Sequence, residues 1–142
     1  MTDGIAVTVE LFAIADAVTV MSDGRVNLLG GVPEFWSVPA ADPRGRLSLA
    51  LTLSTSGMDV AIPIQLALHL MSEHDGEILR SELTMPPGAR NPDLFVSGAR
   101  AVRSMAIVLE LEFQSVGPHS LELIDPGTDQ VISAAGFSVR FT

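Results

Sequence analysis

The sequence predicts an all-β protein: one antiparallel β-sandwich domain over residues 1–142, immunoglobulin-like or of a related type. Three observations predict this class. Apolar and polar residues alternate with a period of two through most of the chain, short turn signals separate the alternating stretches, and 47% of the residues are hydrophobic, which is enough for a sizeable core. Many short strands joined by regular turns are typical of a sandwich or a barrel. We favour the sandwich.

The first half of the chain has five expected strands, at 5–14, 17–21, 25–30, 34–38 and 46–55. Ser22-Asp23-Gly24 joins the second strand to the third, because an Asp-Gly pair supplies the positive φ of a tight hairpin. A Pro-rich connection over 39–45 precedes the fifth strand. That strand alternates most clearly, with one face made by Leu47, Leu49, Leu51 and Leu53.

Five more strands are expected at 61–71, 77–84, 105–114, 119–124 and 131–141. The turn over 73–76 joins the first two of them, and the turn over 125–128 joins the last two. The stretch 86–104 breaks the rhythm, since it contains several Pro and Gly residues and little alternation. It is too long for a routine connection, which indicates a functional or mobile loop. One helical turn over 99–105 is an alternative.

Two motifs near the N-terminus carry a resemblance to a known family. Ala15-Asp16-Ala17-Val18 is followed by the stretch Asp23-Gly24-Arg25-Val26-Asn27-Leu28-Leu29-Gly30-Gly31, and then by Phe35-Trp36-Ser37-Val38-Pro39. With these motifs the chain resembles an uncharacterised family of small bacterial β-sandwich proteins, from about residue 10 to the last strand. The resemblance implies the fold and no activity, and it brings no catalytic or ligand-binding residues.

Charge and composition exclude several function classes. The chain carries eight arginines, no lysine and 17 carboxylates, for a net charge of −9. Binding to nucleic acid or to an anionic membrane needs a basic surface, so neither partner is expected. The absence of cysteine excludes disulfides and thiol chemistry. No basic region precedes an apolar stretch at the N-terminus, and no apolar run approaches the roughly 20 residues of a membrane span, so a cytoplasmic protein is expected.

The sequence contains no recognisable catalytic set, and we expect no enzyme, no catalytic residues and no cofactor. The three histidines, at 69, 74 and 119, are expected at turns and strand edges in contact with solvent, and no Gly-x-Ser-x-Gly motif is present. Acidic residues crowd the turns at 73–77 and 125–129. Asp-Gly hairpin turns account for several of them, so no metal residue is assigned, although calcium binding remains an alternative.

Apolar residues exceed what one buried face of each strand needs. If Val7, Val9 and Leu11 point inward, then Phe12 and Ile14 point outward, as do Val108, Ile124 and Ile132 on later strands. A subunit or partner interface would cover such residues. The alternatives are strands with both faces buried, or a β-bulge that reverses the alternation partway along a strand.

Three arginines fall within the irregular stretch of this acidic chain: Arg90, Arg100 and Arg103. They could contact an acidic partner or the outward stripe formed by Glu82, Glu110, Glu112 and Glu122 on another copy. The sequence therefore predicts a non-enzymatic protein-interaction or assembly module that self-associates. Its candidate partner contacts are Phe12, Ile14, Arg90, Arg100 and Arg103. The alternative is a calcium- or small-ligand-binding domain that uses the acidic hairpin turns.

Overall fold

A computed structural model describes residues 6–31, 33–88 and 99–142 of the chain, and they form ten strands and one short 3-10 helix. The elements in chain order are β1 (Thr8–Ala15), β2 (Ala17–Val20), β3 (Val26–Leu29), β4 (Phe35–Val38), β5 (Arg44–Ser56), η2 (Gly57–Asp59), β6 (Ile64–Ser72), β7 (Gly76–Met85), β8 (Arg100–Glu112), β9 (Gly117–Asp125) and β10 (Gln130–Phe141). Each of the ten expected strands has a counterpart, and the all-β class is confirmed.

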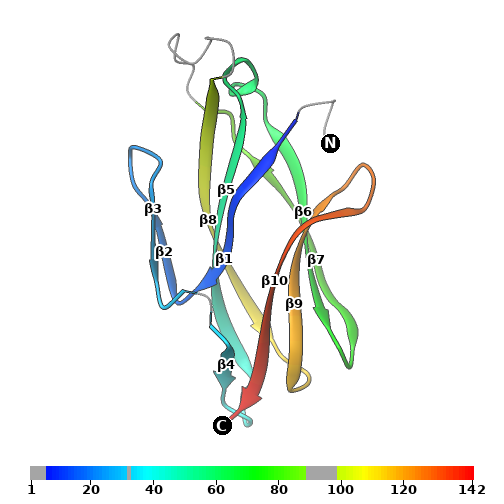
Figure 1. Cartoon of the computed structure of the whole chain (residues 1–142). Helices are drawn as coiled ribbons and strands as arrows, with labels where there is room; N and C mark the ends of the chain where they lie inside the picture. Colours follow the sequence, from blue (N-terminus) through cyan, green and yellow to red (C-terminus); the bar gives the residue numbers. More distant parts are fainter. Residues whose placement is uncertain (1–5, 32, 89–98) are drawn as a thin grey trace.

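The strands form two facing sheets and a separate hairpin (Figure 1). The first sheet has the order β1-β5-β8, the second has the order β4-β10-β9-β6-β7, and β2 pairs with β3 alone. Neighbouring strands run antiparallel, except that β4 runs parallel to β10. This arrangement is sandwich-like. The immunoglobulin-like type within that class stays a prediction. The described residues contain no helix of the length and hydrophobicity that crossing a membrane requires.

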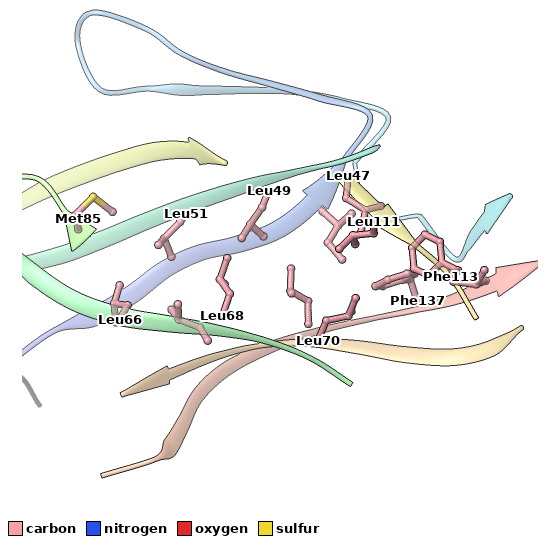
Figure 2. Packing of buried hydrophobic residues seen from close by; sticks show 14 of the residues in the cluster. Leu47, Leu49, Leu51, Leu66, Leu68, Leu70, Met85, Leu111, Phe113 and Phe137 are labelled. Atoms are coloured by element: carbon pink, nitrogen blue, oxygen red, sulfur yellow. The ribbon is translucent and has the colours of Figure 1, made fainter. Parts of the chain in front are cut away.

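The core lies between the two sheets and is made by the alternating leucines that the sequence singles out. Figure 2 shows Leu49 and Leu51 of β5 facing Leu66 and Leu68 of β6. At one end of the core, Phe113 makes an edge-to-face contact with Phe137, with ring centroids 6.3 Å apart. Because successive side chains of a strand point to opposite faces, this buried set leaves the polar residues of β5 on the outer face of the first sheet.

A β-bulge in β1 reverses the orientation expected for its second half. Val9 is paired with Leu53 and Leu11 with Thr52, so Glu10 is an extra residue without a partner on β5. Residues after the bulge therefore change face. Ile14 is only 2% exposed, and Phe12 packs against the core as well. The expectation that these two side chains point outward is wrong.

Of the three other apolar residues expected on the outside, two are covered by the fold and one is exposed. Ile124 is buried, and Ile132 packs against the core where the pairing of β10 with β9 shifts register. Val108 remains outside, with 48% of its surface exposed. Most of the apparent surplus of outward apolar residues therefore belongs to the core.

Strand β8 begins five residues earlier than expected. Arg100 pairs with Ser56 and the ladder continues without a break to the pair formed by Glu112 and Arg44. The residues 100–104 thus belong to a strand and not to an irregular loop, and the alternative of a helical turn over 99–105 is wrong. Arg90 lies outside the described residues.

Candidate functional site: the groove beneath the β2–β3 hairpin

The β2–β3 hairpin stands beside the outer face of the first sheet, the face turned away from the core (Figure 1). At its tip, the Asp23 carboxylate accepts hydrogen bonds from Arg25, from the backbone N–H at 3.1 Å and from Nε at 2.7 Å. Gly24 between them has a φ of +87°, a conformation that glycine adopts without steric strain. The Ser-Asp-Gly-Arg turn thus holds the guanidinium of Arg25 at the hairpin tip.

The base of the hairpin is held by a close approach between two segments. The Asp16 N–H donates to the Leu29 carbonyl at 2.9 Å, and the next residue, Gly30, has a φ of +64°. A Cβ atom at position 30 would overlap the carboxylate of Asp16. The positive φ favours glycine at this position, and any other residue would also force the Asp16 side chain to move.

A groove of about 590 Å³ runs between the hairpin tip and the outer face of the first sheet. Its floor includes the hydroxyls of Thr52 on β5 and Ser104 on β8, which hydrogen-bond each other at 2.8 Å. The lining residues are Leu11, Asp23, Gly24, Arg25, Val26, Thr52, Val102 and Ser104. Val102 is 58% exposed and the side chain of Arg25 is 72% exposed. The groove thus offers a cation paired with a carboxylate, two hydroxyls and apolar walls to a ligand.

Arg100 lies on the same outer face, in a fixed position. It is two residues before Val102 on β8, and its side chain crosses β5 to reach β1. Its Nη2 donates to the Ser54 carbonyl at 2.8 Å and to the Thr8 hydroxyl at 3.2 Å, and its Nε donates to the Ser54 hydroxyl at 3.1 Å. The Ser54 hydroxyl in turn donates to Glu10 at 2.7 Å. The sequence predicts Arg100 as a candidate contact residue, but within an irregular loop and not on the outer face of a sheet.

Arg103 has the opposite orientation, because it is an odd number of residues from Arg100 on the same strand. It pairs with Leu53 on the core side and is only 6% exposed. Its Nη1 donates to the carbonyls of Ile62 at 2.6 Å and Pro86 at 3.2 Å. Burial lowers the pKa of this guanidinium, and the charge of Asp59 partly opposes that effect. Arg103 ties together the segments at one end of the sandwich and is not exposed to a partner.

On the second sheet, carboxylates outnumber arginines by more than on the first sheet. Seven carboxylates lie on its strands β6, β7, β9 and β10 or on the turns that connect them: Glu73, Asp75, Glu77, Glu82, Glu122, Asp125 and Asp129. On β8 of the first sheet, Glu110 and Glu112 oppose Arg46 and Arg44. The four glutamates expected to form one stripe therefore lie on two different sheets. The groove is on the less acidic side of the molecule.

A second groove, of about 460 Å³, lies at the other end of β5 and β8 and is a weaker candidate. It is lined by Arg44 and Arg46, but also by Glu110 and Glu112. Arg44 is bound to Asp42, with its Nε 2.7 Å from the carboxylate, and this pairing lowers the pKa of Asp42. Each of its arginines faces a glutamate across β5 and β8, and its described lining offers no hydroxyl group to a ligand.

His74 is exposed in its turn, as expected, whereas the other two histidines are less exposed than expected. His69 lies on the outer face of the second sheet, with Nε2 3.0 Å from Glu77 and Nδ1 3.7 Å from Glu122. The Glu77 approach is an electrostatic contact, since Nε2 makes no aligned hydrogen bond. His119 is 4% exposed and stacks on Phe137, so its expected solvent exposure is wrong.

The acidic turns hold their carboxylates with the chain's own donors. Asp75 accepts a hydrogen bond from the Ser115 hydroxyl at 2.6 Å, and Asp129 binds Arg80 at 3.0 Å. Asp125 accepts from the Gly127 N–H at 3.0 Å, as an Asx turn requires. Among residues 6–31, 33–88 and 99–142, no group of three or more His, Asp or Glu residues could hold a metal ion.

One solved structure that is similar to the chain is that of the Pseudomonas fluorescens alkylpurine DNA glycosylase AlkC bound to DNA containing an abasic site analog. The two share 13% sequence identity with a TM-score of 0.45, and the similarity covers 76% of this chain and 28% of the glycosylase chain. No family model matches the chain, and no curated protein matches it.

This comparison corrects two expectations from the sequence. The similar structure is a DNA glycosylase on DNA, which contradicts a self-associating protein-interaction module and a set of partners without nucleic acid, whereas the expectation of no enzyme stays a prediction. Both expectations are withdrawn, together with the calcium- or small-ligand-binding alternative. At this distance the similarity assigns no activity and no ligand to the chain. The side chains that line the groove are the basis for proposing a ligand.

Proposed function

We propose that the chain binds a single strand of nucleic acid through its sugar–phosphate backbone, in the groove beneath the β2–β3 hairpin. The observation that carries the proposal is the guanidinium of Arg25, fixed at the groove by Asp23 through Nε. Neither Nη group of Arg25 has a hydrogen-bond partner among the described residues. Arginine with free Nη donors is well suited to a phosphate, which accepts two parallel hydrogen bonds.

The other lining residues fit the same ligand. Serine and threonine hydroxyls commonly contact phosphate and sugar oxygens, and Thr52 and Ser104 supply two of them. Leu11 and Val102 offer apolar surface to the sugar carbons. No aromatic side chain of the described residues lines this groove, so they offer bases no platform on which to stack. We therefore expect recognition of the backbone with little dependence on sequence.

The acidity of the whole chain limits the strength of binding but does not prevent it at this face. Most carboxylates on the second sheet are separated from the groove by the core, and salt screens charges over about 8 Å at 0.15 M. Asp23 in the lining and Glu10 beside Ser54 already accept hydrogen bonds from the chain. Weak, salt-sensitive binding is the expected result.

The test is fluorescence anisotropy with a labelled 12-nucleotide oligothymidylate, measured over a series of salt concentrations. Each phosphate contact on a single strand contributes a slope of about −0.7 to log affinity against log salt. Arg25→Ala should weaken binding and reduce the slope by about that amount. Arg80→Ala is the matched control, since it removes the same charge from the second sheet. Absence of binding by the wild-type chain, or equal losses in the two variants, would refute the proposal.

We propose binding without a catalytic step. Of the histidines, His69 contacts two glutamates and His119 is buried in the aromatic end of the core, and neither lines the groove.

The cytoplasmic location expected from the sequence stays a prediction.

A further inference from the structure

We infer that Arg100 is a second phosphate contact in line with the groove, so that the ligand is a strand of at least two phosphates and not a mononucleotide. This inference rests on the proposed function, because it extends the same site. Binding of one phosphate at Arg25 would not require Arg100.

The position of Arg100 follows from the register of β5 and β8. Val102 and Thr52 line the groove, and the next residues of the same face in the same direction are Arg100 and Ser54. Two residues of a strand span about 7 Å. The outer face therefore continues from the groove to Arg100 without a change of strand or of side, and an extended ligand lying along β8 would reach it.

The side chain of Arg100 is already ordered for such a contact. Three acceptors hold its Nε and Nη2: the Ser54 carbonyl, the Ser54 hydroxyl and the Thr8 hydroxyl. Its Nη1 has no hydrogen-bond partner among the described residues, and the residue is exposed. A guanidinium held on one side loses less conformational entropy when its free side binds an anion.

The charge of Arg100 is only partly compensated by its surroundings. The carboxylate of Glu10 is bound to the Ser54 hydroxyl, which separates it from the guanidinium by one hydroxyl group. No salt bridge between Arg100 and a carboxylate of the described residues is formed. Arg25, Arg44 and Arg80 differ from Arg100 in this respect, because each is bound to an aspartate. Near the groove, Arg25 keeps both Nη groups and Arg100 keeps Nη1 for a ligand, whereas Arg46, at the other end of β5, faces Glu110.

The experiment is a competition series in which 5′-phosphorylated oligothymidylates of one, two, four and eight nucleotides displace the labelled 12-mer. The wild-type chain should bind the dinucleotide about threefold more tightly than the mononucleotide, the gain typical of one exposed charge pair. Arg100→Ala should abolish that gain, leave mononucleotide binding unchanged and reduce the salt slope for the 12-mer by about 0.7. Arg46→Ala removes the same charge elsewhere on the first sheet and should retain the gain.

Two further variants keep the outcome interpretable. Arg100→Lys retains the charge and should restore most of the length dependence, and Arg100→Gln replaces Arg100→Ala if the latter fails to fold. If the wild-type chain binds no oligonucleotide, the proposed function itself fails. If it binds with an affinity independent of length, and Arg100→Ala behaves like Arg46→Ala, the proposed function stands and the second contact is refuted.

Discussion

At the scale of single residues, the side of the sheet to which a side chain points decides its role. Ile14 and Val108 are both β-branched apolar residues on strands of the first sheet, yet Ile14 is 2% exposed and Val108 is 48% exposed. Arg100 and Arg103 differ in the same way, since one lies on the outer face and the other on the core side. The residue type alone does not predict which member of each pair is buried.

Ile14→Ala should lower the free energy of unfolding by about 2–5 kcal/mol, because it leaves a cavity in a packed core. Val108→Ala is the matched control and should change that free energy by no more than about 0.5 kcal/mol. The midpoint and slope of urea unfolding measure both. Similar small losses in the two variants would show that Ile14 is not in the core.

At the scale of elements, the bulge in β1 sets which residues reach the core. Glu10 is the extra residue, with Val9 paired before it and Leu11 paired after it. If Glu10 were absent, Val9 and Leu11 would follow each other in regular alternation, and Phe12 and Ile14 would keep their side. A residue within the regular part of the strand, such as Ala13, has no such freedom.

Deletion of Glu10 should therefore be tolerated, with a loss of about 1 kcal/mol for its hydrogen bond with Ser54. Deletion of Ala13 should prevent stable folding, because a shift of one residue moves every following or preceding side chain of the strand to the wrong face. Circular dichroism and thermal unfolding of the two deletion variants provide the comparison. Equal damage from both deletions would contradict the bulge.

At the scale of the whole molecule, the net charge of −9 describes an uneven surface. The strands β6, β7 and β9 and their turns carry most of the acids of the second sheet, while Arg25 and Arg100 lie at the outer face of the first. Charges on opposite sheets influence each other only when salt does not screen them. The Debye length is about 30 Å at 0.01 M salt and about 8 Å at 0.15 M.

The double variant Glu73→Gln and Glu82→Gln, on the second sheet, should therefore strengthen oligonucleotide binding at 0.01 M salt and leave it unchanged at 0.15 M. Glu10→Gln, close to Arg100, should strengthen binding at both salt concentrations. Anisotropy titrations at the two concentrations distinguish the cases. An effect of the double variant that persists at 0.15 M would place the bound strand on the other side of the molecule.

Comparison of particular elements shows how far the sequence could predict this fold. The leucines of β5 alternate without interruption, and the strand was expected at 46–55 and lies at Arg44–Ser56. The start of β8 was missed because Arg100–Ser104 contains charged and small residues after a Pro- and Gly-rich stretch, so the apolar alternation starts only at Met105. Hydrogen bonds to β5 extend β8 into residues that show no apolar alternation.

The sequence by itself determined the all-β class, the ten strands and the hairpin turns, because alternation and turn chemistry are properties of neighbouring residues. The tertiary structure decided which side chains of β1 are buried after the bulge at Glu10, and which face of the sheet carries the groove. The groove combines Leu11, Arg25, Thr52 and Ser104, which lie far apart in the chain. The packing of the hairpin on the first sheet brings these residues together. A pattern among neighbouring residues cannot predict this contact between distant segments.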